Sequence, residues 1–316
     1  MLPSLGSGIL PDVPVKRAVP RPLSVSIVGP GNLGAALALT LSSAGWEVKF
    51  IAVRSSAAAK SRDARALAKR VHARLVVLGR RPLESDVVWL TVPDDAIRQV
   101  AHQLGGTQQW QGRIAFHSSG ALTSDELAPL RERGARVASV HPGMTFVRSS
   151  VPNMAGVPFA IEGHPAATRL ARKVVEQLGG TSHAINKRNK VLYHAFGSFA
   201  SPMVIALIAS LERVGKAAGI APRNVKAMMA PLLWQTLRNY LRHDAASAFS
   251  GPLARGDLET VRKHLAELEA VPEAREVYVA LARVAARNLP VKNRASIEKE
   301  LNRHTWKRSS RHGSRC

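Results

Sequence analysis

The sequence has little cysteine, few aromatic residues and few acidic residues. Its one cysteine, Cys316, stands at the last position, so no disulfide can form within the chain and no oxidising compartment is implied. Aromatic residues make up 5% of the 316 residues, and the apolar residues are mostly Ala, Val and Leu. This favours α/β or helical packing over a β-sandwich, and the length suggests two domains.

Several kinds of functional site are also missing. There is no G-x-x-x-x-G-K-[ST] loop for nucleotide hydrolysis and no G-x-S-x-G turn for a nucleophilic serine. The histidines lack cysteine partners and metal-ligand spacing, so we expect no metal site.

Neither a signal peptide nor a membrane span is expected. Residues 1–22 are rich in proline and lack an apolar run preceded by basic residues. The most apolar stretch, residues 196–211, is shorter than the ~20 residues of a bilayer span. We expect it to be a buried helix of a cytoplasmic protein.

The scarcity of acidic residues leaves a strong positive charge. Lys and Arg number 45 against 22 Asp and Glu, which gives a formal charge of +23. The excess is concentrated in residues 54–81 and 287–315. We interpret these as a solvated basic face and a disordered tail, and we do not expect nucleic acid as a partner, because the tail lacks interleaved aromatic residues.

Apolar strands alternate with helices through the first half of the chain. Strands are predicted at residues 23–28, 47–53, 73–78, 86–92, 113–117, 136–140, 157–161 and 182–185. The run 86–92 is apolar without alternation, as in a strand buried on both faces of a parallel sheet. The pattern predicts a Rossmann-type, doubly wound parallel sheet of the α/β class.

After residue 186 only helical periodicity remains. Helices are predicted at residues 187–218, with a kink at Pro202, and at 222–242, 257–269 and 272–288. The predicted domains are therefore a flexible arm (1–22), a Rossmann NADP-binding domain (23–185), an all-helical substrate and dimerisation domain (186–290) and a basic tail (291–316).

A glycine fingerprint follows the first strand. It reads Gly29-Pro30-Gly31-Asn32-Leu33-Gly34. In a dinucleotide-binding turn the first glycine permits the tight turn, the second lets the backbone approach the pyrophosphate, and the third allows close packing of helix on strand. The flanking strand and Ala-rich helix favour this interpretation over a glycine turn without a ligand.

The second strand ends without a carboxylate. An NAD-binding chain carries Asp or Glu about 20 residues past the fingerprint, for the ribose 2′-OH. Here Arg54, Ser55 and Ser56 occupy this place. A guanidinium and two hydroxyls suit a 2′-phosphate, so the predicted cofactor is NADP. The alternative is that Arg54 is merely solvated.

Polar residues also follow later strands, at the edge that faces the ligand in such sheets. Val92 and Pro93, before the helix cap expected at Asp94, are predicted to pack on the cofactor's nicotinamide side. The remaining candidates, which could transfer a proton or bind a carbonyl or carboxylate, are His117, Ser118, Ser119, His141, His194 and Arg255. For His117 and His141, which end adjacent strands, a structural hydrogen-bonding role is an equal alternative.

Six segments carry a resemblance to a known family. They read V-G-P-G-N-L-G, L-T-V-P-D-D-A-I, H-S-S-G-A-L, S-V-H-P-G-M-T-F, Y-H-A-F-G-S-F-A-S and G-P-L-A-R-G-D. The sequence resembles bacterial proteins that join a Rossmann-like NAD(P)-binding domain to a helical domain of unknown function. These proteins belong to the broad 6-phosphogluconate dehydrogenase-like group, with pyrroline-carboxylate reductases, prephenate dehydrogenases and ketopantoate reductases as relatives.

The resemblance implies an oxidoreductase with its active site between two domains, and a homodimer joined through the helices. Likeness to prephenate dehydrogenases makes Ser118 or Ser119 and His141 substrate-contacting candidates. Many relatives use a Lys or Asn on the helix between the domains, where this sequence has Lys190, Tyr193 and His194. The resemblance does not decide which of these corresponds.

The sequence therefore predicts hydride transfer from NADPH to a small carbonyl or imine substrate that bears a carboxylate. The resemblance offers ketopantoate, a 2-oxo acid, as one example. The alternative is a non-catalytic protein that senses NADP(H) and binds nucleic acid or a partner through its basic tail.

Overall fold

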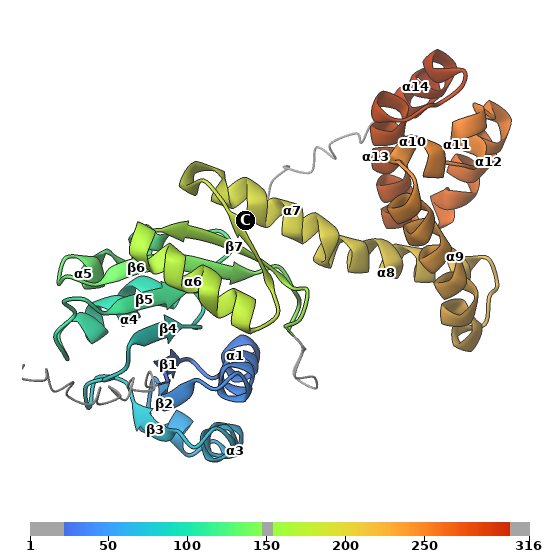
Figure 1. Ribbon diagram of the computed structural model, residues 1–316. Coiled ribbons are helices and arrows are strands. Elements are labelled where there is room, and N and C mark those ends of the chain that lie inside the picture. Colours follow the sequence, from blue (N-terminus) through green and yellow to red (C-terminus); the bar gives the residue numbers. More distant parts are fainter. Residues whose placement is uncertain (1–21, 147–153, 304–316) are drawn as a thin grey trace, which may run out of the picture. The chain divides into compact units, whose positions relative to one another are not determined.

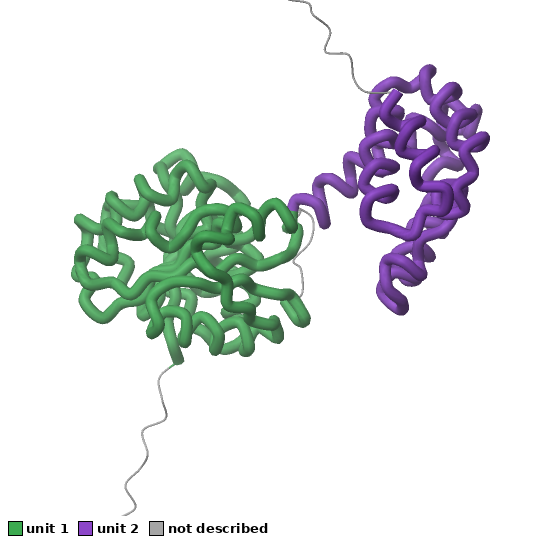
Figure 2. Tube along the Cα trace, turned by 90° about the horizontal axis from the view of Figure 1, so that it is seen from above, with its two compact units in different colours: residues 1–197 green, residues 198–316 purple. Residues whose placement is uncertain are grey.

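A computed structural model describes residues 22–146 and 154–303 of the chain. The predicted arm up to residue 21 and the last part of the predicted tail, from residue 304, lie outside the described residues. The chain divides into two compact units, Met1–Gly197 and Ser198–Cys316 (Figure 2). The first unit thus extends past the domain boundary predicted at residue 185.

The first unit is built on one eight-stranded sheet. Its strands are β1 (Ser24–Val28), β2 (Glu47–Val53), β3 (Arg74–Val77), β4 (Val87–Leu90), β5 (Ile114–His117), β6 (Arg136–Pro142), β7 (Pro158–Gly163) and β8 (Thr181–Ala184). Their order is β3-β2-β1-β4-β5-β6-β7-β8. All neighbouring pairs are parallel except β6 and β7, which run antiparallel. The doubly wound α/β fold is confirmed, but the sheet is mostly rather than wholly parallel.

Helices cover both faces of this sheet (Figure 1). The unit's α-helices are α1 (Asn32–Ser43), α2 (Ser56–Ala59), α3 (Arg62–Arg70), α4 (Asp94–Gly105), α5 (Ala128–Arg131), α6 (Pro165–Gln177) and the first part of α7 (Lys190–Ala200). Residues of α1, α3 and α6 share one buried cluster with Val87 and Trp89 of β4. Residues of α4 and α5 share the other with Val88 and Leu90. Successive side chains of β4 thus enter opposite cores, which explains its continuous apolar run.

The second unit is helical. After the end of α7 it contains α8 (Pro202–Ala217), α9 (Pro222–Arg242), α10 (Ala245–Ala248), α11 (Pro252–Arg255), α12 (Leu258–Glu267), α13 (Pro272–Asn288) and α14 (Arg294–Arg303). Ile297 and Leu301 of α14 are fully buried and pack with Val261 and Leu265 of α12. The tail predicted from residue 291 is therefore a packed helix as far as Arg303. The many basic residues of this segment favoured a disordered tail, although Ile297 and Leu301, four residues apart, form the apolar pair of a helix.

The expectation that residues 196–211 form a buried helix is wrong for the single chain. The segment forms the end of α7 and most of α8, and Phe196 and Phe199 are 70% and 74% exposed. By length and composition, the helical segment Lys187–Ala217 would suffice to cross a bilayer, and none of its most apolar window is buried. Core helices of proteins outside membranes meet the same criterion.

Candidate functional site

The glycine fingerprint forms the turn between β1 and α1. Gly29 has a φ of +94°, which favours glycine, and a Cβ there would lie 2.8 Å from Cγ1 of Val92. A Cβ on Gly34 would collide with the carbonyl oxygen of Gly29 and with Oγ1 of Thr91. Around Gly31, in contrast, no atom of the described residues, its chain neighbours aside, lies within 4 Å of where a Cβ would be. Two glycines are thus needed for packing, and the middle one faces open space.

This turn lies where the strand order reverses. β1 has β2 on one side and β4 on the other, and the chain passes from the β1–β3 half of the sheet to the half that begins with β4. Thr91, after β4, donates from Oγ1 to the carbonyl oxygen of Gly29 at 2.7 Å. This bond holds the following Val92 and Pro93 beside the fingerprint. Ligands of open α/β sheets bind in the crevice at this switch point.

The residues predicted to select NADP lie at the same edge of the sheet. β2 pairs with β1 so that Ala52 faces Val28, and Arg54 follows the end of β2 with an exposed side chain. Ser55 accepts a hydrogen bond from the amide of Ala58 at 3.2 Å and caps α2, which Ser56 begins. Arg54 is therefore free of the sheet, next to the glycine turn.

His117, at the end of β5, is fully buried. Its Nε2 lies 2.9 Å from the carbonyl oxygen of Thr123, and its Nδ1 accepts from the amide of Ser119 at 3.1 Å. Burial, together with the charge of Lys190, lowers the pKa of His117 to about 3. Both ring nitrogens thus form hydrogen bonds with backbone groups, and the ring is neutral near pH 7.

Ser118 and Ser119 are also engaged inside the unit. The indole Nε1 of Trp89 donates to Oγ of Ser118 at 2.8 Å. Ser119 donates from Oγ to Oδ2 of Asp94 at 2.7 Å and accepts from the amide of Leu122. Asp94 was expected to cap α4, but Pro93 is the cap residue and Asp94 instead accepts from Ser119. Both hydroxyls therefore shape the loop after β5.

His141 near the end of β6 meets α7. Its Nδ1 lies 2.9 Å from the hydroxyl of Tyr193, and its ring is edge to face with that of His194. A Cβ on Gly120 would lie 2.8 Å from Nε2 of His141 and 2.6 Å from Cδ2 of His194. The lack of a side chain at Gly120 therefore lets the two imidazoles pack directly against this loop. Burial, then the charges of Lys190 and His194, lower the pKa of His141 to about 4, so its ring is neutral near pH 7.

Lys190, the first residue of α7, is fully buried. Its Nζ donates to the carbonyl oxygen of Ser119 at 2.8 Å and to Oγ of Ser139. Burial lowers its pKa to about 8, against the opposing charges of Glu162 and Asp94. The sequence pointed to its neighbourhood but not to its burial, because lysine is almost never fully buried.

Arg255 belongs to the second unit. It is the last residue of α11 and is exposed, and Gly256 after it adopts the left-handed conformation. Asp257 accepts from the amide of Thr260 at 3.0 Å and caps α12. The structure brings the other candidates together in the first unit and leaves the role of Arg255 as a prediction.

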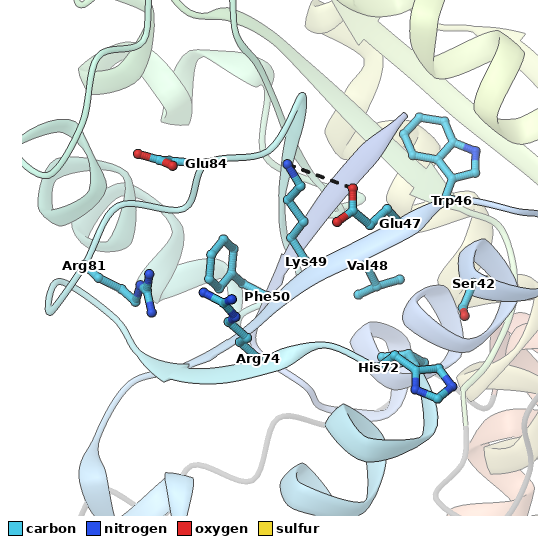
Figure 3. A pocket seen from close by; sticks show the side chains of 11 residues that line it. Ser42, Trp46, Glu47, Val48, Lys49, Phe50, His72, Arg74, Arg81 and Glu84 are labelled. Atoms are coloured by element: carbon cyan, nitrogen blue, oxygen red, sulfur yellow. Dashed lines mark ion pairs between the residues drawn. The ribbon is translucent and has the colours of Figure 1, made fainter. Parts of the chain in front are cut away.

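A separate polar cavity lies at the opposite end of the strands. It has a volume of about 580 Å³ and is lined by residues around the starts of β2 and β3. Figure 3 shows Arg74 and Arg81 near Phe50, and Glu47 paired with Lys49 two residues along β2. The guanidinium of Arg81 lies over the Phe50 ring. This cavity contains none of the predicted site residues.

Two family descriptions match consecutive parts of the chain. Residues 11–142 match the Rossmann-like domain, and residues 157–285 match a domain of unknown function, DUF2520. A comparison with curated protein sequences gives no match.

Solved structures share the fold over most of the chain. A Bacteroides fragilis protein provisionally described as an NADP oxidoreductase is 19% identical, with a TM-score of 0.68 over 84% of this chain and 98% of its own. A Thermotoga maritima protein is 23% identical, with a TM-score of 0.66 over 87% and 99%. An imine reductase from Myxococcus stipitatus, in complex with NADP+, is 15% identical, with a TM-score of 0.63 over 88% and 99%. The resemblance carried by the sequence motifs is confirmed: the chain joins a Rossmann-like domain to a DUF2520 domain.

Proposed function

We propose that this protein is an NADP(H)-dependent oxidoreductase that transfers a hydride to a small, carboxylate-bearing carbonyl or imine. The observation that carries the proposal is the open space at Gly31. It lies between two glycines that are needed for packing, at the switch point of the sheet. No acidic residue stands in the first turn of α1, so the positive end of this helix is available to a pyrophosphate.

The phosphorylated coenzyme fits better than NAD. Arg54 is exposed at the end of β2, and no carboxylate stands beside it to accept from a ribose 2′-OH. A guanidinium binds a phosphate through paired, charge-assisted hydrogen bonds. Structures of fold relatives hold NADP+ or NADPH, which supports the same assignment.

His141 is the group best placed to donate a hydrogen bond to the reacting oxygen or nitrogen. Because its ring is neutral near pH 7, the proton itself is proposed to come from solvent. When bound, the coenzyme supplies the hydride, and the oxygen or nitrogen that receives negative charge then needs a proton. Nε2 of His141 lies against Gly120, in the loop after β5. With Nδ1 accepting from Tyr193, the tautomer that carries its proton on Nε2 is favoured. His194, which is exposed beside it, is proposed to bind the substrate.

The other candidates support this site. His117, Ser118 and Ser119 are buried, and the hydrogen bonds described above hold them within the loop after β5. We propose that they fix the shape of this loop. Arg255 remains the proposed clamp for the substrate's carboxylate.

The test combines coenzyme binding with turnover. Calorimetric titration should give tighter binding of NADPH than of NADH, and NADPH oxidation should be observed with at least one member of a panel of 2-oxo acids and cyclic imines. Binding without turnover for any substrate would favour the alternative of an NADP(H)-sensing protein. Loss of salt-dependent nucleic-acid binding on deletion of residues 304–316 would then support that alternative.

We also propose that two copies form a homodimer through the helices. Large apolar side chains along α7, α8 and α9 are exposed in the single chain: Val191, Leu192, Phe196, Phe199, Met203, Ile205, Met228, Leu232, Trp234 and Leu241. Many large apolar side chains exposed along successive helices are typical of a protein interface. Sedimentation should give a dimer that Phe199→Glu dissociates, whereas Leu23→Glu, a similar change on the sheet unit, should leave it intact. A monomeric wild type would contradict the proposal.

A further inference from the structure

The most unusual group that the proposed function leaves unexplained is the ammonium of Lys190. It is fully buried at the start of α7, whereas the neighbouring lysine, Lys187, is 41% exposed and forms an ion pair with Asp125 at the surface. A buried ammonium is costly unless hydrogen bonds and opposite charges compensate for its lost hydration. A charge kept in such a place therefore needs a structural explanation.

The partners of Lys190 come from two neighbouring strand ends. Nζ donates to the carbonyl oxygen of Ser119, in the loop after β5, and to the hydroxyl of Ser139 in β6. Ser139 in turn donates to the same carbonyl of Ser119 at 3.2 Å. The three groups form a closed set of hydrogen bonds that joins α7 to both strands.

The compensating negative charges lie on two further elements. Glu162 of β7 and Asp94 of α4 both attract the ammonium. Each is held in turn, since Glu162 accepts from the amide and hydroxyl of Ser124 and Asp94 accepts from Ser119. Lys190 is therefore the centre of a polar network that spans the carboxyl edge of the sheet.

Tyr193 lies one helical turn after Lys190. Residues three apart share a face of a helix, so fixing Lys190 against the sheet also directs Tyr193 toward the sheet. The Tyr193 hydroxyl there meets Nδ1 of His141, and the loop held by Lys190 continues directly into Gly120. One buried ammonium thus positions both the imidazole's partner and the glycine that borders its Nε2.

We propose that Lys190 is a positioning residue that acts through Tyr193 and His141, and that it does not itself meet the substrate. This proposal rests on the proposed function only in its catalytic consequence. The arrangement of Tyr193 and His141 can be measured without any substrate.

The first experiment uses NMR on full-length protein labelled with ¹⁵N-histidine. Tyr193→Phe identifies the imidazole signal of His141 that depends on the tyrosine. Lys190→Met should shift the same signal in the same direction, because the helix no longer holds Tyr193 in place. Lys187→Met, a matched change at an exposed lysine three residues earlier, should not. An unchanged His141 signal in Lys190→Met would overturn the proposal.

The second experiment uses NADPH turnover with any substrate found. Lys190→Met should lower kcat by about 100-fold with a small change in KM, the size expected when reacting groups are displaced by about 1 Å. Tyr193→Phe added to Lys190→Met should cause little additional loss, because both changes break the same path. Fully additive losses would show that Lys190 acts independently of Tyr193 and would overturn the proposal.

A milder variant tests the same proposal if Lys190→Met does not fold. Ser139→Ala removes only one acceptor of the ammonium, and it should shift the His141 signal part of the way seen in Tyr193→Phe. No shift would count against the positioning role. If no substrate is turned over, the proposed function fails while the NMR result still decides the role of Lys190.

Discussion

Nδ1 of His141 lies 2.9 Å from the hydroxyl of Tyr193, and the two rings meet at 86°. The contact joins β6 to α7 within the first unit. A second His–Tyr pair, His264 with Tyr278, has the same chemistry and lies entirely in the helical unit. The two pairs allow the proposed catalytic contact to be compared with a similar one elsewhere.

Tyr193→Phe should lower kcat about fivefold, because it removes a hydrogen bond of about 1 kcal/mol that orients the His141 imidazole. NADPH affinity should change little, since the hydrogen bond of Tyr193 goes to His141 and not to the glycine turn. Tyr278→Phe is the matched control and should leave kcat close to the wild-type value. Steady-state kinetics of both variants, with thermal unfolding as a check on folding, decide the point. Equal losses in the two variants would remove the special role of the His141 pair.

Arg54→Asp should weaken NADPH binding about 10- to 100-fold, because a charge-assisted contact contributes about 1.5–3 kcal/mol. It should leave NADH binding nearly unchanged or slightly improved, since a carboxylate can accept from the 2′-OH. Arg172→Asp makes the same change of charge on α6 and controls for the loss of positive potential. An unchanged ratio of the two affinities, measured by calorimetry, would refute the assignment of NADP.

Gly31→Ala and Gly34→Ala should fail in different ways. At Gly31 the methyl group enters open space, so we expect normal thermal stability with NADPH affinity reduced by tenfold or more where the pyrophosphate approaches. At Gly34 the methyl group collides with the Gly29 carbonyl, and we expect a loss of about 1–3 kcal/mol in the free energy of unfolding. Calorimetric binding and denaturant titration separate the two. Similar behaviour of both variants would contradict the proposed coenzyme approach.

The buried histidines should make stability fall in mild acid. The pKa of His117 is lowered from 6.5 to about 3 by folding. Below pH 6.5 this histidine therefore becomes protonated in the unfolded chain while it stays neutral in the folded chain. Stability is therefore fully present above pH 6.5 and is lost as pH falls toward 3, by up to about 1.4 kcal/mol per pH unit for each such histidine. His141 contributes in the same direction between 6.5 and about 4.

Denaturant unfolding between pH 7 and pH 5 tests this, because carboxyl groups titrate mainly at lower pH. His117→Asn should be less stable at pH 7 but should show a smaller slope against pH. His102→Gln, at an exposed position on α4, should keep the wild-type slope. A slope unaffected by His117→Asn would show that this histidine is not held neutral.

Elements with a strong local signal could be predicted from the sequence. β2, α9 and α13 have the predicted bounds, and both helices begin at a proline, which is favoured in the first turn. The glycine turn was also recognisable, because its three roles depend on residue type alone. What could not be predicted depends on contacts between distant segments. A short apolar run such as β7 does not indicate whether the strand is parallel or antiparallel to its neighbour. The burial of Lys190 depends on Ser119, Ser139 and Glu162, which are distant in the sequence and meet at one place.

Lys190, the first residue of α7, holds the start of this helix against the sheet. The division between the two compact units falls within the same helix, after Gly197. This sets where the protein can be separated into modules. A fragment ending at residue 185 would contain the whole sheet and the glycine turn but would lack Lys190 and Tyr193. Domain exchange with a relative should therefore place the junction beyond Gly197, so that the sheet keeps the first turns of the helix that completes its edge.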